Sequence, residues 1–282
     1  MSGGVYLFNK PEGLTSRTAS TLVARAWGYS KRGHCGTLDP AATGVLPVLL
    51  GSATRLSPFL TGGLKTYSFT LLLGVTTDSD DMEGEVTSRT DASAVTPLML
   101  SWAVDALTGT LSQKAPLFSA VRVGGVRAYR SARTGGRPDM PSRTVEVSNW
   151  EVGELKDCSA RLRVTVSPGT YIRALARDLG GSLGVGGVAT RIEREFSGGF
   201  SIDECSGEYD DPAAMLTMAE AMRGYPVHRL TLPETDAVLH GIPVQGLLHG
   251  TVAMVSGDGR LVAVGQGNGE TIHPACVLEK QC

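Results

Sequence analysis

The stretch of residues 33–47 constrains the fold of this chain more than any other. It reads GHCGTLDPAATGVLP, and its one carboxylate, Asp39, stands among glycine, proline and threonine residues. Gly36 and Gly44 permit backbone angles that a side chain would forbid. Pro40 fixes its own torsion angle and pushes Asp39 toward an extended conformation. The stretch therefore predicts a loop that holds one acid in one geometry.

The chemical role of this acid has two interpretations. From the residues alone, Asp39 can be a turn residue that hydrogen-bonds its own backbone, as the acid of an Asp-Pro pair commonly does. The stretch also resembles the catalytic motif of the TruB family of tRNA pseudouridine synthases, G-H-x-G-T-L-D-P-x-A-T-G-x-L-P. Every fixed position of that pattern is met here. The resemblance implies that Asp39 is the catalytic nucleophile.

Further motifs extend the resemblance over about residues 4–203. They are KPEGLTS at residues 10–16, Lys65-Thr66-Tyr67, and GTYIRALARDLG at residues 169–180. The implied fold class is α+β, with a mixed, largely antiparallel sheet flanked by helices (the pseudouridine synthase fold) and a small β-rich C-terminal PUA-like module. A boundary near residue 224 divides the chain into a predicted catalytic domain, residues 1–224, and a predicted RNA-binding module, residues 225–282.

Three residues besides Asp39 are candidates for the catalytic site. From the pattern alone, Tyr67 is an ordinary strand aromatic, while Tyr171 and Arg173 are a buried tyrosine and a solvated arginine. By the resemblance, Tyr67 stacks on the target base and Tyr171 lies near it, where it helps remove the C5 proton. The resemblance also pairs Arg173 with Asp39. Such a pairing would keep the carboxylate ionised, as a nucleophile must be.

The charge distribution is more informative than the net charge of −2, which by itself does not favour a nucleic-acid partner. Residues 114–143 carry a local excess of lysine and arginine over a single acid, Asp139. This excess can follow a phosphate backbone, or it can be a solvated surface balanced by acids elsewhere. The residues predicted to contact RNA are Lys10, His34, Lys65, Arg122, Arg133 and Arg143.

Two further titratable residues allow alternatives. As a loop histidine, His34 can be a general base or simply a structural residue. The resemblance assigns it to a motif that reshapes RNA where the base is flipped. Asp178 could form a dyad with Asp39, as in glycosidases, but a helical acid here is more simply expected to pair with Arg177 or Arg173.

The chain departs from the family pattern at two places. Ala115-Pro116 stands where the family usually has two prolines before Ser119-Ala120. In the late element, Glu193 and Glu195 replace a basic and a hydroxyl residue. The second departure puts RNA contacts at these two positions in doubt, but not the chemistry at Asp39.

Periodicity and turn residues predict the main elements. Gly257-Asp258-Gly259 is a hairpin signal between residues 251–256 and 261–264. The other expected segments are strands at residues 5–10 and 67–73, paired extended segments at 143–150 and 160–167, and helices from Thr15 or Ser16 to about 27, at 96–107 and at 170–183. The short tail is expected to dock on the rest of the chain.

Composition excludes several classes of protein. The five cysteines are never spaced as C-x-x-C, which argues against a disulfide framework and a zinc site and suits a reducing cytoplasm. No stretch approaches the roughly 18–20 apolar residues of a membrane span. The chain has no Walker loop or dinucleotide fingerprint, so we expect no metal and no nucleotide cofactor.

The resemblance thus implies a tRNA pseudouridine synthase. It would flip uridine 55 of the T loop out of the T arm and attack it with Asp39, as a monomer without an obligate protein partner. Three alternatives remain: a non-catalytic RNA-binding protein in which Asp39 is structural, a glycoside hydrolase with a second acid, and a guide-RNA-dependent pseudouridine synthase. The short tail and the lack of basic extensions favour the stand-alone enzyme over the guide-dependent one.

Overall fold

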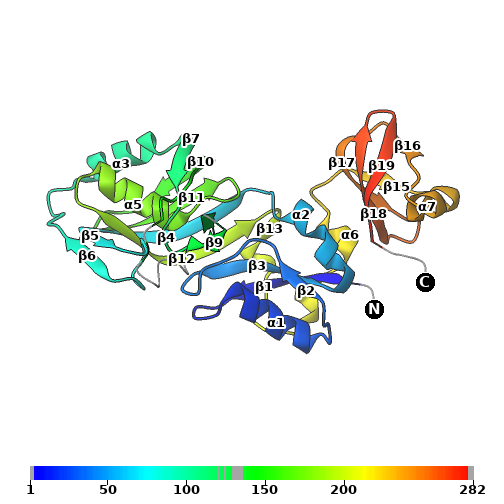
Figure 1. The fold of residues 1–282 in the computed structure, drawn as a ribbon, viewed down its shortest axis with the longest axis horizontal. Helices are drawn as coiled ribbons and strands as arrows, with labels where there is room; N and C mark the ends of the chain where they lie inside the picture. The colour runs from blue at the N-terminus through cyan, green and yellow to red at the C-terminus, as the bar shows by residue number, and fades with distance from the viewer. Residues whose placement is uncertain (1–2, 120, 124, 129–135, 137, 279–282) are drawn as a thin grey trace. The chain divides into compact units, whose positions relative to one another are not determined.

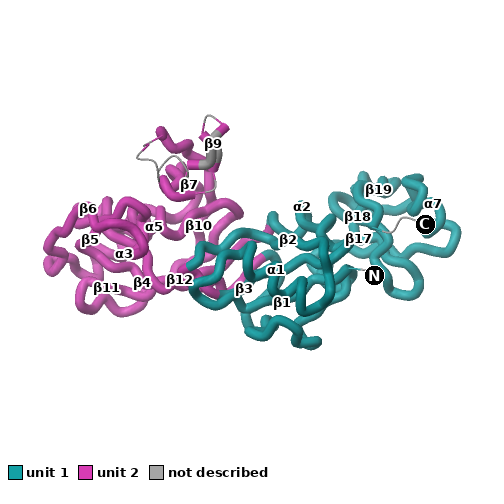
Figure 2. Tube along the Cα trace, turned by 60° about the horizontal axis from the view of Figure 1, so that its bottom comes forward, with its two compact units in different colours: residues 1–40, 44–62, 198–282 teal, residues 41–43, 63–197 magenta. Residues whose placement is uncertain are grey.

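The fold was analysed in a computed structural model, which describes residues 3–119, 121–123, 125–128, 136 and 138–278 (Figure 1). The chain divides into two compact units, coloured separately in Figure 2. Unit 1 comprises residues 1–40, 44–62 and 198–282, and unit 2 comprises residues 41–43 and 63–197.

The N-terminal part of unit 1 is a small antiparallel sheet with helix α1 (Ser16–Ala26) against it. Its strands, in spatial order, are β14 (Met215–Leu216), β1 (Gly4–Lys10), β3 (Thr43–Leu50) and β2 (Arg32–His34). The predicted cap of α1 is confirmed, because the Thr15 hydroxyl accepts a hydrogen bond from the Thr18 backbone N–H. Short elements complete this part: η1 (Gly51–Leu56), α2 (Ser57–Leu60), β13 (Phe200–Ser201), η2 (Ile202–Glu204), η3 (Pro212–Ala214) and α6 (Met218–Ala221).

The tail of unit 1 forms its own five-stranded sheet with helix α7 (Leu232–Leu239). Its spatial order is β15 (Val227–Arg229), β17 (His249–Val255), β18 (Leu261–Asn268), β19 (Thr271–Val277) and β16 (Val244–Gln245). The predicted hairpin is confirmed in β17 and β18. A buried apolar cluster that includes Leu7, Leu49, Ala253 and Leu261 joins this sheet to the N-terminal part, as expected for a docked tail. The domain division at residue 224 stays a prediction.

Unit 2 is built on an antiparallel sheet. Its strands, in spatial order, are β12 (Gly187–Ser197), β4 (Lys65–Leu73), β11 (Ser159–Val166), β10 (Ser142–Val152) and β7 (Gly109–Lys114). Helix α5 (Ile172–Ser182) packs against β12 and β4, and α3 (Pro97–Ala106) packs against α5. Two small hairpins belong to this unit: β5 (Val75–Thr77) with β6 (Val86–Arg89), and β8 (Arg122–Val123) with β9 (Val126–Arg127).

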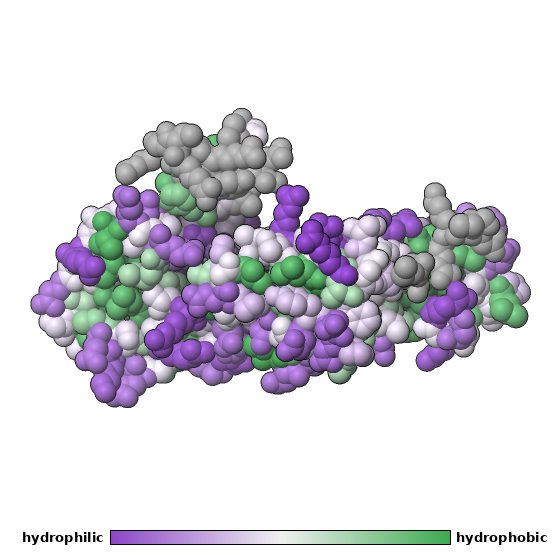
Figure 3. All heavy atoms as spheres, turned by 90° about the horizontal axis from the view of Figure 1, so that it is seen from below, coloured by the Kyte–Doolittle hydropathy of each residue, from purple (hydrophilic) through white to green (hydrophobic). Residues whose placement is uncertain are grey.

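The expected α+β class with a largely antiparallel sheet is confirmed. The elements predicted from periodicity agree with the structure to within a few residues, including the antiparallel pairing of β10 with β11. Within the described part of the chain, no helix is long and apolar enough to cross a membrane. On the face drawn in Figure 3, apolar residues form small groups between hydrophilic ones.

Candidate active site

Asp39 lies in the loop that joins β2 to β3, residues 35–42, which we call the Asp39 loop. Ser16, the first residue of α1, binds both backbone polar groups of Leu38, the residue before Asp39. Its hydroxyl donates to the Leu38 carbonyl (3.0 Å) and accepts from the Leu38 backbone N–H (2.8 Å). Gly36 and Gly44 adopt φ values of 82° and 101°, so the two glycines predicted to need unusual angles have them.

The residue after Asp39 is held just as closely. The Pro40 carbonyl accepts hydrogen bonds from the Gly13 backbone N–H (2.9 Å) and the Lys10 ammonium (3.1 Å). The same ammonium donates to the carbonyls of Pro11 (2.8 Å) and Leu14 (2.9 Å), and the residue is 0% exposed. Lys10 therefore has no surface to offer a phosphate, contrary to the expectation that it contacts RNA, and it braces the Asp39 loop.

Lys65 also differs from its expected role as an RNA contact. It is 6% exposed at the start of β4, and its ammonium donates to the Gly63 carbonyl (2.9 Å). His34 ends β2 and is half-buried, and its assignment to RNA binding stays a prediction. Arg133 lies outside the described residues, and Arg122 is described only by its backbone in β8.

Tyr67 is a buried residue of β4, 7% exposed. Its neighbour on β12 is Arg194, which is 0% exposed and whose Nη1 lies 3.5 Å from the Tyr67 hydroxyl. A fully buried arginine is uncommon, because a desolvated charge is costly unless polar groups surround it. Arg194 was not among the predicted site residues, although it stands at an arginine position of the family's late element.

Tyr171 caps the N-terminal end of α5 in an extended conformation. The Gln113 side chain on β7 accepts from the Tyr171 backbone N–H (2.8 Å) and donates to its carbonyl (3.1 Å). The Arg143 guanidinium lies 5.2 Å from the centre of the Tyr171 ring and donates to the Gly169 carbonyl (3.3 Å). Strands β7 and β10 thus fix both the backbone and the ring of Tyr171.

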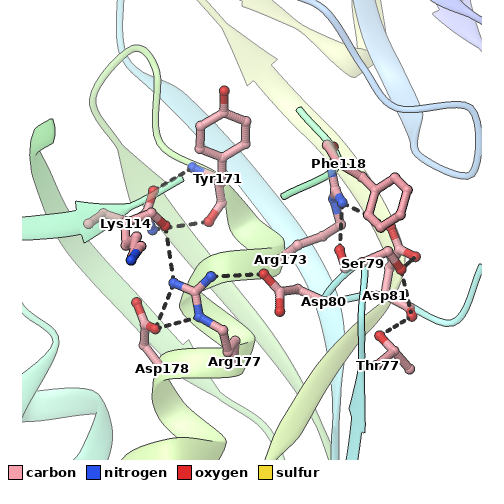
Figure 4. Close-up of polar contacts among 11 residues, drawn as sticks. Thr77, Ser79, Asp80, Asp81, Lys114, Phe118, Tyr171, Arg173, Arg177 and Asp178 are labelled. Atoms are coloured by element: carbon pink, nitrogen blue, oxygen red, sulfur yellow. Dashed lines mark hydrogen bonds and ion pairs between the residues drawn. The ribbon is translucent and has the colours of Figure 1, made fainter. Parts of the chain in front are cut away.

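Arg173 is a buried residue of α5, 4% exposed, so the interpretation as a solvated arginine is wrong. Its guanidinium donates to the carbonyls of Ser79 (2.6 Å) and Phe118 (3.0 Å) and lies 3.3 Å from an Asp81 carboxylate oxygen (Figure 4). Asp39 belongs to unit 1 and Arg173 to unit 2, so their pairing stays a prediction. Asp81, which holds the Arg173 guanidinium, was not among the predicted site residues.

Asp81 is itself held by its own segment of chain. The Ser79 hydroxyl donates to its carboxylate (2.6 Å), and the Thr77 hydroxyl donates to its carbonyl (2.6 Å). The Glu83 backbone N–H donates to the same carboxylate (3.0 Å). These contacts make residues 77–81, which we call the acidic segment, a rigid support for the Arg173 guanidinium.

The two glutamates that depart from the family pattern lie on β12 and face arginines of β11, two strands away in the sheet. Glu195 lies 2.6 Å from Arg163, and Glu193 lies 3.6 Å from Arg161. The expected pairing of Asp178 is also confirmed, since Arg177 Nε donates to it at 2.9 Å.

A pocket of about 460 Å³ opens beside the acidic segment. Its lining includes Asp80, Lys114, Phe118, Met140 and Arg177. Among the described residues, no group of three or more histidine, cysteine, aspartate or glutamate side chains is arranged to hold a metal ion.

Comparison with known proteins defines the class. The family model described as TruB family pseudouridylate synthase (N terminal domain) matches residues 24–172. The chain is 39% identical to tRNA pseudouridine synthase B of Thermobifida fusca, with 99% of each chain covered. It is 38% identical to the protein of that name from Mycobacterium sp. (strain KMS), covering 94% of this chain and 92% of the relative. This chain belongs to the TruB family of pseudouridylate synthases.

A solved structure supports the same fold. A chain in the crystal structure of a Cbf5–Nop10–Gar1 complex superposes with a TM-score of 0.73 at 26% sequence identity. The match covers 98% of this chain and 85% of that chain. The expected pseudouridine synthase fold is therefore confirmed.

Proposed function

We propose that this chain is a tRNA pseudouridine synthase that isomerises uridine 55 in the T loop. The observation that carries the proposal is the complete Asp39 motif, whose acid stands between two residues clamped by hydrogen bonds to the 10–16 region. The near full-length similarity to proteins named tRNA pseudouridine synthase B supports tRNA as the substrate.

The proposed reaction is an isomerisation that needs no cofactor. The target uridine flips out of the T loop. Stacking of its base on an aromatic face such as Tyr67 compensates for the stacking energy that is lost on flipping. The Asp39 carboxylate attacks the nucleoside, and the bond between C1′ and N1 breaks. The uracil turns, C1′ bonds to C5, and the C5 proton leaves with the help of Tyr171. Asp39 is released in its original form, and N1 ends with a proton.

Arg173 is the proposed partner of the Asp39 carboxylate. Its guanidinium has a fixed position because two carbonyls and Asp81 hold it before any substrate arrives. A cation fixed in this way stabilises a carboxylate without having to reorganise during the reaction. The role of Asp81 in this proposal is to position Arg173.

RNA binding is proposed for His34, Arg122, Arg133 and Arg143, and for residues 225–282 as a separate module. Arg143 is already held over the Tyr171 ring, so it can present its charge beside the target base. We propose that the chain acts as a monomer and without a protein partner.

The test is tritium release from tRNA transcript labelled with [5-³H]uridine, using the wild type and Asp39→Asn side by side. We expect release by the wild type and a loss of at least about 1,000-fold in the variant, because the amide is a poor nucleophile. A transcript with cytidine at position 55 should release no tritium. Equal release by the wild type and Asp39→Asn would remove Asp39 from the mechanism.

The similarity to a chain of the Cbf5–Nop10–Gar1 complex raises a second candidate, an enzyme that works with partner proteins. The same assay separates the two. Release by the purified chain with tRNA alone supports the stand-alone enzyme, and release only after partner proteins and a guide RNA are added supports the second candidate.

A further inference from the structure

Helix α5 presents two arginines one turn apart, and each contacts the acidic segment. Arg173 meets Ser79 and Asp81, as described above. Arg177, four residues later on the same face, lies 2.8 Å from Asp80 (Figure 4). Its guanidinium also contacts Asp178 (2.9 Å) and donates to the Lys114 carbonyl of β7 (3.1 Å).

Asp80 stands in the chain between the two groups that contact Arg173. The residue before it provides the Ser79 carbonyl, and the residue after it provides the Asp81 carboxylate. Its own φ is 63°, in the left-handed region that aspartate and asparagine tolerate better than most residues. The chain turns at this point, so successive carboxylates reach different arginines of α5. Movement of Asp80 would therefore displace the contacts that Arg173 makes with Ser79 and Asp81.

Ionised Asp80 does not make the folded state more stable, so a contribution to stability does not explain why an acid stands at this position. Burial raises the pKa of its carboxyl above the ordinary value, although the Arg177 guanidinium acts in the opposite direction. A raised pKa means that, at neutral pH, the ionised group costs the folded state free energy relative to the protonated one. Buried ion pairs often cost more in desolvation than their attraction returns.

We infer that Asp80 and Arg177 form a positioning pair, which holds the acidic segment so that Ser79 and Asp81 keep the Arg173 guanidinium aligned for catalysis. The inference rests on the proposed function, since its effect is read through Arg173 and Asp39. In this inference the pair acts only through Arg173, to which Ser79 and Asp81 connect it. The contact between Asp80 and Arg177 is separate from the contacts that Arg173 makes with Ser79, Phe118 and Asp81.

The main test is Asp80→Asn, which keeps the size of the side chain and tolerates the left-handed backbone while removing the charge. Single-turnover pseudouridine formation should slow about tenfold, because small displacements near a reacting centre are costly. The dissociation constant for tRNA should change less than about twofold, and the melting temperature should not fall. A merely structural residue would instead lower the melting temperature along with activity.

Asp178→Asn is the matched control, since it removes the other carboxylate on Arg177 but leaves the acidic segment bound. Its single-turnover rate should stay within about twofold of the wild type. If Asp80→Asn slows the reaction no more than Asp178→Asn does, the inference is wrong.

A second test uses Arg177→Gln and the double variant with Asp80→Asn. If the two residues act as one pair, the double variant should be no slower than the slower single variant. Losses that multiply would show independent roles and overturn the pairing. A wild type inactive on every RNA tested would overturn the proposed function and this role with it, whereas an active wild type with an unimpaired Asp80→Asn would overturn the pair alone.

Discussion

The Asp39 loop and the acidic segment are held in place by different forces. In the Asp39 loop, Ser16, Gly13 and Lys10 bind backbone groups of the residues on either side of Asp39. In the acidic segment, charged side chains carry the contacts, because Arg173 and Arg177 meet Asp81 and Asp80.

The difference has a chemical consequence. The contacts of Ser16, Gly13 and Lys10 are made to backbone groups of Leu38 and Pro40, so a change of bonding at the Asp39 carboxylate leaves these contacts in place. The acidic segment depends on ionised groups, so its geometry depends on charge and pH. Backbone clamps suit a residue that reacts, and ion pairs suit residues that orient a charge.

Among the changes that test this comparison, we expect the largest effect from removing an arginine that contacts the acidic segment. Arg173→Met should destabilise the chain by about 3–5 kcal/mol, because removing one partner leaves the other charge buried without compensation. It should also reduce activity at least about 100-fold. Arg173→Lys keeps the charge but cannot reach Ser79, Phe118 and Asp81 at once. It should recover most of the melting temperature in thermal unfolding while activity stays low.

Recovery of activity by Arg173→Lys would show that charge alone matters at this position. The comparison between the two regions would then lose its basis, since geometry would not be what the acidic segment provides.

A smaller effect is expected when the backbone clamp is broken. Lys10→Met leaves the carbonyls of Pro11, Leu14 and Pro40 without their ammonium donor and should cost about 1–3 kcal/mol in the free energy of unfolding. Denaturant unfolding measures this change. Well below the melting temperature, activity should fall less than in Arg173→Met, because Ser16 and Gly13 still hold the loop. An activity loss as large as that of Arg173→Met, with normal stability, would contradict the assignment of Lys10 as a brace.

The smallest effect concerns pH. Because burial raises the pKa of Asp80 in the folded chain, its contribution to stability is complete below the ordinary Asp pKa and is lost as the pH rises through the folded value. Asp80→Asn cannot titrate at this position. The melting temperature of the variant relative to the wild type should therefore increase from about pH 4 upward. A difference that shrinks as the pH rises would show that the charged pair stabilises the fold.

The sequence by itself determined the local features of this protein. The glycines and Pro40 specified the Asp39 loop, Thr15 and Ser16 marked the start of α1 to within one residue, and residues 257–259 specified the hairpin of the tail. These features could be predicted because they depend on backbone angles and neighbouring residues, which the sequence states directly. The complete motif around Asp39 also placed the chain in its family.

Only the tertiary structure decided how the charged residues are used. Lys10 and Lys65 were expected to contact RNA and are buried, while Arg194, Asp81 and Asp80 were not among the predicted site residues. The physical reason is that a charge can be buried only where carbonyls or opposite charges surround it, and strands and loops far apart in the chain provide them. The residue type shows that a side chain can carry a charge. The fold decides whether that charge contacts solvent, backbone carbonyls or an opposite charge.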